Sequence, residues 1–532
     1  MSQHYLSRRD LLRATTAAGV LAPFMPRAAW AQAGGRAVMN IICHPEPATL
    51  FIGLEQNAQV QLVCGKMYES LLTYDFDFTP RPSLAKSWEI SDDGLVYTFH
   101  LVENAKWHDG KSFTAEDVVF TCKEFLMEMH SRARVNFSYC REIEALDDHT
   151  VRFTLREPFG PFIMAFEFSS APMIPAHIYK GTDYRTNPAN NTPIGTGPFK
   201  LAEWRRGSFI RLEKNPDYHG EGEPHLDELI FHILPDGASR AVALEQGKVD
   251  LSSSFDIEMF DVQRLASLPH LELETRGYEF MAPVARIEFN TRIPPFNDKR
   301  FRQAICHALD KQLFTDMIFF GLGRPATGPV SYRTRFYEPN VKVYDYDLDK
   351  AKALLDDMGL KPGPDGIRHT VKFLRLPWGE TWARFAELVQ QQLALIGLRV
   401  EIEPSDPGSW TQRYGNWEFE MTSNYPYQFG DPALGVARFF LSSNIKKGLP
   451  YSNCTGYTNP EVDEAFAAGA SSTDPAVRQA AYSKAQKILV EDAPMAWLVE
   501  VDFPTLYNPV FQNITTTAIG VNETFRVVRK AG

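Results

Sequence analysis

Cysteine is scarce in this sequence and never occurs in the spacing that metal or thiol chemistry requires. None of the six cysteines in the 532 residues belongs to a Cys-x-x-Cys pair, and no His-Glu-x-x-His or His-x-His run occurs. The sequence therefore disfavours zinc ribbons, thioredoxin-like redox sites and zinc hydrolases. Cys306 lies in an apolar helical pattern and is expected to be a buried free thiol. The pairing of the others is left open: Cys43, Cys64, Cys122, Cys140 and Cys454.

A run of apolar residues long enough to span a bilayer, roughly 20 residues, is also absent. The N-terminal stretch "ATTAAGVLAPFM" comes closest, but it is short and interrupted. It follows the twin arginines Arg8 and Arg9 and precedes Ala31 and Ala33, which fit the small residues before a cleavage site. We interpret residues 1–33 as a twin-arginine export signal rather than a buried N-terminal helix. The mature protein is then expected in the periplasm.

The sequence has no excess of basic residues. The whole chain holds 55 Lys and Arg against 66 Asp and Glu. Cleavage after Ala33 removes four basic side chains and one acidic one, which leaves 51 against 65 and a net charge of −14. An acidic surface repels phosphate groups, so a nucleic acid is not expected as a partner.

What the sequence does contain is an ordinary globular composition with two kinds of periodicity. Hydrophobic residues make up 44%, and the chain is too long for one core, so two or more domains are expected. In the first half, residues 96–101 and 149–159 alternate apolar and polar side chains, as strands do. In the second half, helical periodicity begins at Asp298 and returns at 474–494, and residues 381–404 predict a helix that ends near Gly397 and is followed by a strand. This pattern predicts two α/β domains.

The stretch "WHDGKSFTAEDVVF" places His108 beside Asp109, two residue types that serve acid–base and metal chemistry. A metal centre needs further ligands at defined spacing, and none is visible. A turn at Asp109–Gly110, followed by a capping-box pattern of Thr114 and Asp117, accounts for every residue without chemistry. We therefore interpret the stretch as a turn leading into a helix, and an exported metal-dependent hydrolase is the less favoured alternative.

The residues around this turn carry a family resemblance. In chain order they form Leu-Ala-x-Ser-Trp, Asp-Asp-Gly, Phe-x-Leu, His-Asp-Gly and Thr-Ala-Glu-Asp-Val. These runs are Leu84–Trp88, Asp92–Gly94, Phe99–Leu101, His108–Gly110 and Thr114–Val118. The stretch resembles the family 5 extracytoplasmic solute-binding proteins, which include dipeptide, oligopeptide and nickel receptors of ABC importers. Later runs such as "IGTGPFKL" and "YTNPEVDEAF" extend the resemblance over nearly all of the mature chain.

The resemblance implies an α/β protein with the two-lobed periplasmic binding protein fold of class II, or cluster C. Lobe I would hold residues 34–284 and 505–532, with an extra β-rich subdomain at 71–194, and lobe II would hold 285–504. The lobes would close on a ligand, and ABC permease subunits in the inner membrane would recognise the closed form. The resemblance implies no enzymatic activity, cofactor or metal, and we expect a monomer.

The ligand expected first is a peptide or a peptide-like small organic solute. Among peptide-binding relatives, an aspartate three positions before the Gly-Asp-Pro aspartate pairs with the peptide's α-ammonium. In "SNYPYQFGDPALGV" Gln428 holds that position. Leaving one partner of a buried ion pair alone costs about 3–5 kcal/mol. An ordinary free-amine dipeptide is therefore disfavoured, unless Glu46 or Asp431 takes over the role.

Several other side chains are candidate ligand contacts. Arg375 could hold a ligand carboxylate with two parallel hydrogen bonds. Four aromatic residues could stack on a ring or a peptide plane: Trp378, Trp410, Tyr425 and Tyr427.

A second set of candidates lies earlier in the chain. The segment 127–137, with His130, Arg132 and Arg134, is expected to approach the cleft. Where nickel-binding relatives carry an arginine, this chain offers Ser169 and Ser170. A non-peptide ligand stays open as an alternative, namely an opine, an oligosaccharide or a metal chelate, as does reuse of the fold in a sensor or structural protein.

Overall fold

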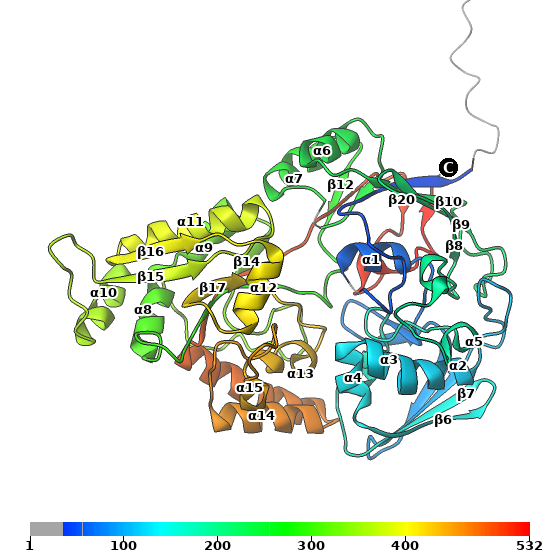
Figure 1. The fold of residues 1–532 in the computed structure, drawn as a ribbon, viewed down its shortest axis with the longest axis horizontal. Coiled ribbons are helices and arrows are strands. Elements are labelled where there is room, and N and C mark those ends of the chain that lie inside the picture. Colours follow the sequence, from blue (N-terminus) through cyan, green and yellow to red (C-terminus); the bar gives the residue numbers. More distant parts are fainter. Residues whose placement is uncertain (1–35, 56, 255, 532) are drawn as a thin grey trace, which may run out of the picture. The chain divides into compact units, whose positions relative to one another are not determined.

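Two large sheets and one smaller sheet, each built from its own set of strands, organise the chain (Figure 1). The computed structural model describes residues 36–55, 57–254 and 256–531. The predicted export signal, residues 1–33, lies outside these ranges. Contacts divide the chain into Met1–Arg36 and Ala37–Gly532, and the features below all belong to the second unit.

The first sheet has seven strands in the order β12-β19-β11-β1-β10-β9-β8. They are β1 (Val38–Cys43), β8 (Phe199–Arg205), β9 (Phe209–Lys214), β10 (Glu228–Ile233), β11 (Leu251–Ser252), β12 (Glu272–Glu274) and β19 (Thr505–Tyr507). β1 pairs in parallel with β10, Val38 opposite Glu228. Met39, Ile41 and Ile42 are completely buried, as expected for a strand covered on both faces. Helices α1 (Ala58–Cys64), α6 (Gly237–Glu245) and α7 (Met259–Ala266) belong to the same region of the fold.

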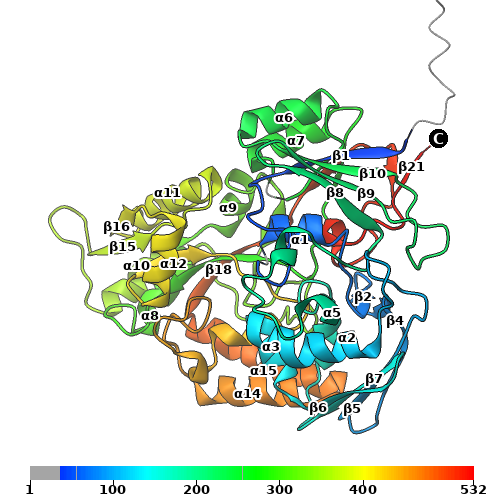
Figure 2. The same ribbon diagram turned by 45° about the vertical axis from the view of Figure 1, so that its right-hand side comes forward.

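A four-stranded antiparallel sheet forms the β-rich part between β1 and β8 (Figure 2). Its order is β4-β5-β7-β6, with β4 (Ala85–Ile90), β5 (Val96–Leu101), β6 (Cys140–Asp147) and β7 (Thr150–Leu155). In β5, Tyr97, Phe99 and Leu101 are buried and the residues between them are half-buried, which confirms the predicted alternation. Helix α2 (Ala115–Phe120) packs on β6 and β7, and Phe137 of α4 (Ser131–Phe137) meets Phe153 of β7. Between these helices lie η1 (Thr121–Phe125) and α3 (Leu126–Met129).

The His-Asp-Gly run is a turn, as predicted. Gly110 has φ of +89°, and its N–H donates to the Trp107 carbonyl at 2.8 Å. His108 Nε2 bonds the Gly197 carbonyl at 2.9 Å, and burial lowers the pKa of His108 to about 4. The neutral imidazole therefore fastens the turn to the segment that precedes β8.

The second large sheet has six strands in the order β14-β18-β13-β17-β15-β16. They are β13 (Val284–Phe289), β14 (Gly323–Pro325), β15 (His369–Leu374), β16 (Leu398–Glu403), β17 (Met421–Asn424) and β18 (Met495–Val501). Every residue of β13 and β18 is buried, so these two strands form the centre of this core.

Helices connect the strands of this second sheet and cover it. They are α8 (Lys299–Ala308), α9 (Lys311–Met317), α10 (Leu348–Asp357), α11 (Glu380–Ala394), α12 (Pro407–Gly415), α13 (Pro432–Gly435), α14 (Pro460–Ser471) and α15 (Pro475–Asp492). The side chain of Asp298 accepts from Arg300 N, which confirms the predicted N-cap of α8. Cys306 in this helix is buried and free, also as predicted.

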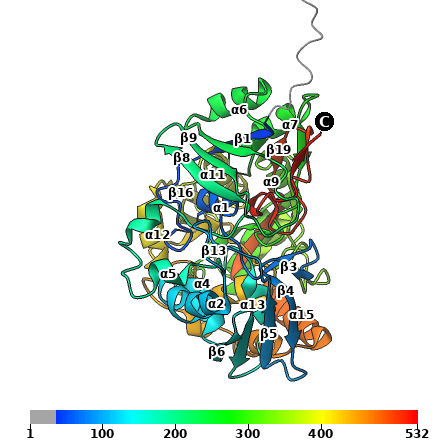
Figure 3. The same cartoon turned by 90° about the vertical axis from the view of Figure 1, so that its right-hand side faces the viewer.

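The chain passes between the two large sheets twice, at residues 275–283 and 502–504. Lobe I below means the seven-stranded and four-stranded sheets with their helices, and lobe II means the six-stranded sheet with its helices. The lobes are in contact: α15 lies beside the four-stranded sheet in Figures 2 and 3, and Gly160 N donates to the Ala470 carbonyl at 2.8 Å. No helix in the described part of the chain has both the length and the apolar character needed to cross a membrane.

Candidate ligand-binding site

Phe429 reaches from lobe II into lobe I. Its backbone N–H donates at 2.6 Å to the carbonyl of Phe280, which lies in the passage 275–283 between the lobes, and its φ of +53° is followed by +73° at Gly430. A Cβ on Gly430 would lie 2.7 Å from atoms of both Phe78 and Met164, so this turn requires glycine. The turn after β17 is thus built to press Phe429 against the other lobe.

Two arginines share the ring of Phe429. The guanidinium carbon of Arg132, at the start of α4 in lobe I, lies 3.9 Å from the ring centroid. The guanidinium carbon of Arg438, which follows α13 in lobe II, lies 5.5 Å from the same centroid. Cation–π contact with one ring therefore holds a positive charge from each lobe.

The polar surroundings of Arg132 leave part of its guanidinium unused. Its Nη2 donates to the Ser169 carbonyl at 2.8 Å and to the Ser169 hydroxyl at 3.2 Å. Its Nε is buried and has no hydrogen-bond partner in the described part of the chain. Glu167 interacts with it electrostatically, but the Glu167 carboxylate accepts from Ser169 N at 2.6 Å and from Ser169 Oγ at 2.7 Å.

Arg438 lies close to other positive charges. Its Nε donates to the Gly435 carbonyl at 3.2 Å. Burial, together with the nearby charges of Arg132 and Arg286, lowers the pKa of Arg438 to about 10. Arg286 is itself paired, since its Nη2 lies 2.7 Å from Glu288 Oε1 in a buried ion pair. Arg438 is thus the cation of this group whose charge is least compensated.

Aromatic side chains from lobe II continue the site in two groups. Tyr427 packs edge-on against Phe429 at 6.4 Å, and Tyr425 stacks on Trp382 at 4.7 Å. In the second group, Trp378 meets Trp410 edge-on at 5.4 Å. Trp410 is completely buried, whereas Trp378 is 38% exposed, so Trp378 is the more available of the two for a ligand.

The predicted polar contacts have partners within the chain. Gln428 donates from Nε2 to the Pro329 carbonyl and accepts from Ser331 N, both at 3.0 Å. Asp431 is fully buried and caps α13. Its two carboxylate oxygens accept hydrogen bonds from Arg478 Nη2 at 2.9 and 2.7 Å. A ligand contact by either residue stays a prediction, and it would have to share these bonds.

Glu46 and Arg375 are placed differently from each other. Glu46 accepts from Trp204 Nε1 at 2.9 Å and from Gly207 N at 3.0 Å, so it fastens the β8–β9 hairpin. Arg375 follows β15 and is half-buried, and its Nε has no hydrogen-bond partner among the described residues. Arg375 therefore keeps the donor capacity that its predicted role requires.

The other residues of segment 127–137 support the fold. His130 Nε2 bonds the Ser169 carbonyl at 2.9 Å, and burial lowers the pKa of His130 to about 3. Arg134 donates to the carbonyls of Met127 and Glu128, both at 2.6 Å. Of the three candidates in this segment, Arg132 is the one that meets the other lobe.

The cavity beside Phe429 is small. It has a volume of about 20 Å³, and residues of both regions line it, including Glu167, Phe280, Tyr427 and Phe429. Such a volume holds little more than one water molecule. The side chains of both lobes therefore pack tightly around the ring.

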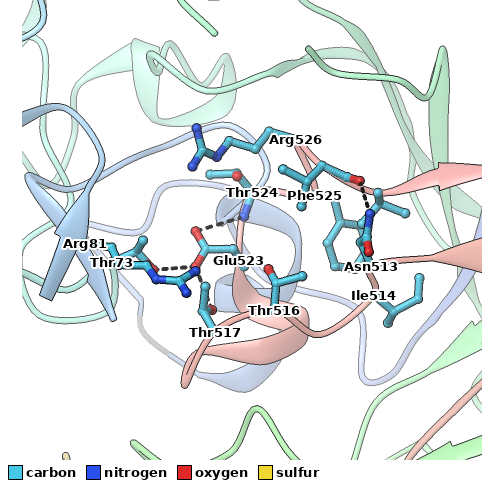
Figure 4. A pocket seen from close by; sticks show the side chains of 12 residues that line it. Thr73, Arg81, Asn513, Ile514, Thr516, Thr517, Glu523, Thr524, Phe525 and Arg526 are labelled. Carbon is cyan, nitrogen blue, oxygen red and sulfur yellow. Dashed lines mark hydrogen bonds between the residues drawn. The ribbon is translucent and has the colours of Figure 1, made fainter. Parts of the chain in front are cut away.

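A separate pocket of about 320 Å³ lies within lobe I, against the C-terminal segment (Figure 4). Its carboxylate, Glu523, accepts from Thr73 Oγ1 at 2.6 Å and from Thr517 Oγ1 at 2.8 Å. All of its lining residues come from 73–81 and 513–528, so lobe II adds nothing to it. In the described ranges, no group of three or more His, Cys, Asp or Glu side chains could hold a metal ion.

Comparison of the sequence with known protein families identifies the family of the chain. Residues 79–447 match the family model described as bacterial extracellular solute-binding proteins, family 5 Middle. The chain belongs to this family.

Individual relatives match this family 5 protein over most of its length. It is 30% identical over 432 residues to the probable D,D-dipeptide-binding periplasmic protein DdpA of Escherichia coli, covering 80% of each chain. The crystal structure of the ABC transporter substrate-binding protein CtaP of Listeria monocytogenes matches with a TM-score of 0.81 at 26% identity, over 93% of this chain and 99% of that one. DppA of Helicobacter pylori, solved with the peptide STSA, matches with a TM-score of 0.77 at 26% identity, over 93% and 98%. The two-lobed fold is thereby confirmed.

The sequence did not point to two residues at the centre of the candidate site of this family 5 protein, Phe429 and Arg438. Both belong to "QFGDPALGVARFF", where Arg438 is the only cation within an apolar run. A lone arginine in such a run has to find compensation for its charge when it is buried, and this signal could have marked it.

Proposed function

We propose that this protein is the periplasmic substrate-binding component of an ABC importer. It captures a peptide or a peptide-like small organic solute between its two lobes and catalyses no reaction on it. One observation carries the proposal: cationic and aromatic side chains of both lobes converge on Phe429 at the place where the lobes meet. A solute bound there would touch both lobes, and so would favour the closed form over the open one.

The relatives support a peptide-like ligand. The Escherichia coli relative is named for a D,D-dipeptide, and the Helicobacter pylori structure contains a peptide. On this chain we assign the stacking contacts to Tyr425, Tyr427 and Trp378, with Trp410 behind Trp378. Arg375 has an unpartnered Nε and is the proposed polar contact from β15.

The remaining candidates act through the closed architecture. Gln428, Asp431 and Glu46 are bound within the chain, so we propose that they position the turn around Phe429 and the β8–β9 hairpin, and contact a ligand only in addition. The export signal at residues 1–33 would deliver the protein to the periplasm as a monomer, where permease subunits in the inner membrane receive the closed form.

Native mass spectrometry of the protein purified from its own host tests this function. We expect a bound small organic solute that is released on unfolding. We also expect that deleting the gene abolishes uptake of the isotope-labelled solute and that the wild-type gene restores it. Unchanged uptake in the deletion strain, together with solute-free protein, would contradict a role in import.

A further inference from the structure

Arg132 and Arg438 bring two positive charges from opposite lobes to one phenyl ring. Their guanidinium carbons lie 3.9 Å and 5.5 Å from the centroid of Phe429, so their separation cannot exceed the sum of these distances. Arg132 belongs to α4 of lobe I and Arg438 follows α13 of lobe II. Closing the lobes therefore pushes two like charges together.

The rest of the site compensates only part of this charge. In the described part of the chain, no carboxylate lies within ion-pair distance of either guanidinium. Arg286 is neutralised by Glu288, to which Tyr414 also donates at 2.7 Å. Glu167 is the one carboxylate among the described residues that interacts electrostatically with Arg132. Arg132, Arg438 and Glu167 together therefore carry one excess positive charge.

Unused donors accompany the excess charge. Arg132 has a buried Nε without a partner, and Arg438 uses its Nε on a backbone carbonyl. A guanidinium carries five N–H donors in a fork that matches the two oxygens of a carboxylate. A group with one negative charge and two acceptor oxygens would satisfy both the charge and the donors.

We propose that the ligand carries a carboxylate that binds between Arg132 and Arg438, and that repulsion between these two arginines holds the lobes apart until it does. This inference rests on the proposed function and names the chemical class of its ligand. A free-acid peptide, an N-blocked peptide and an opine all carry such a group, whereas a neutral oligosaccharide does not.

The first arm of the test needs no ligand. Small-angle X-ray scattering of the solute-free protein compares wild type with Arg438→Gln and Arg132→Gln at low and high salt. The exposed arginines Arg399 and Arg141, one in each lobe, supply the matched controls Arg399→Gln and Arg141→Gln. At the separation of Arg132 and Arg438, the repulsion between two unit charges shifts the ratio of closed to open protein by about tenfold at an effective dielectric constant near 20.

Removing either central charge should therefore close the solute-free protein by about this factor at low salt, and salt should close the wild type in the same direction because it screens the pair. The controls should scatter as wild type does. Identical scattering of wild type, Arg438→Gln and Arg132→Gln at low salt would overturn the inference.

The second arm uses calorimetry with a panel of N-acetylated dipeptides, each as the free acid and as the primary amide. We expect the free acids to bind wild type at least about tenfold more tightly than the amides, the least that loss of a charge-assisted hydrogen bond costs. In Arg438→Gln this preference should vanish. Amides that bind wild type as tightly as acids would overturn the inference. If neither form binds, the peptide-like ligand of the proposed function is wrong, and the scattering arm alone decides on the arginine pair.

Discussion

Phe429 occupies an unusual position, because its ring contacts two arginines, one from each lobe. An aromatic face attracts a cation, but one ring cannot neutralise two guanidinium groups. The residues around it are otherwise satisfied: Gln428 by two backbone groups and Asp431 by Arg478. At this scale the site has a fixed framework and one region of uncompensated charge.

His108 tests the structural interpretation of "WHDG". It is neutral in the fold, with a pKa lowered to about 4 by burial, and it is protonated in the unfolded chain below its usual 6.5. The unfolded state therefore binds more protons between these values, and stability falls as pH drops through this window, by about 3 kcal/mol from this group. We expect His108→Asn to remove that part of the pH dependence in urea unfolding and to change ligand affinity less than about threefold.

The exposed His225 supplies the control. His225→Asn should keep the wild-type pH dependence of stability. A His108→Asn protein that folds but no longer binds its ligand would instead indicate that His108 takes part in ligand binding.

The hydrogen-bond and packing partners of individual side chains were the hardest feature to predict. The sequence identified Gln428 as the residue that replaces an aspartate, but Pro329 and Ser331, which hold its amide, lie about a hundred positions away. No periodicity connects such segments, because the pairing exists only after the fold has brought distant parts of lobe II together. Arg132 could be selected as a candidate, whereas its neighbour Phe429 could not.

Elements were predicted better, because their signals are local. The alternation in β5, the cap of α8 and the turn at Gly110 all follow from residues within a few positions of each other. The pairing of β1 with β10, and of β19 with β11 and β12, joins distant parts of the chain. The family resemblance assigned residues 34–284 and 505–532 to one lobe, but neither the resemblance nor periodicity gave these strand pairings.

The turn between β17 and α13 offers a test at the scale of an element. Gly430 and Gly448 both have positive φ, +73° and +85°, but only a Cβ on Gly430 would press on lobe I. Each change to alanine strains the backbone by about 1–3 kcal/mol. We expect Gly430→Ala to weaken ligand binding by at least about tenfold beyond Gly448→Ala, because its methyl group meets Phe78 and Met164 and keeps the lobes apart.

Calorimetry with the solute recovered from the native protein measures both variants, and thermal unfolding confirms that both fold. Equal affinities would show that the turn tolerates the methyl group and that closure does not depend on this contact.

At the scale of the whole molecule, the two large sheets are joined in the described part of the chain by two passages, at 275–283 and 502–504. Such a connection is compatible with a hinge, and our proposal is that the contacts at Phe429 and at Gly160 form when the lobes close. Function then depends on the balance between these contacts and the repulsion of Arg132 and Arg438.

Delivery to the periplasm is a second property of the whole chain. Replacing both Arg8 and Arg9 by lysine should leave the precursor in the cytoplasm, because the twin-arginine route requires the pair. Cell fractionation followed by immunoblotting measures this. Normal delivery of the double-lysine variant would indicate that another export route is used.

Closure by a solute is the central claim, and scattering on one sample tests it most directly. Protein purified with its native solute is unfolded in urea, dialysed and refolded to remove the solute, and the solute is then added back. We expect the radius of gyration to rise when the solute is removed and to return to its first value on re-addition. A radius of gyration that stays the same in all three states would contradict a binding protein that works by closing its lobes.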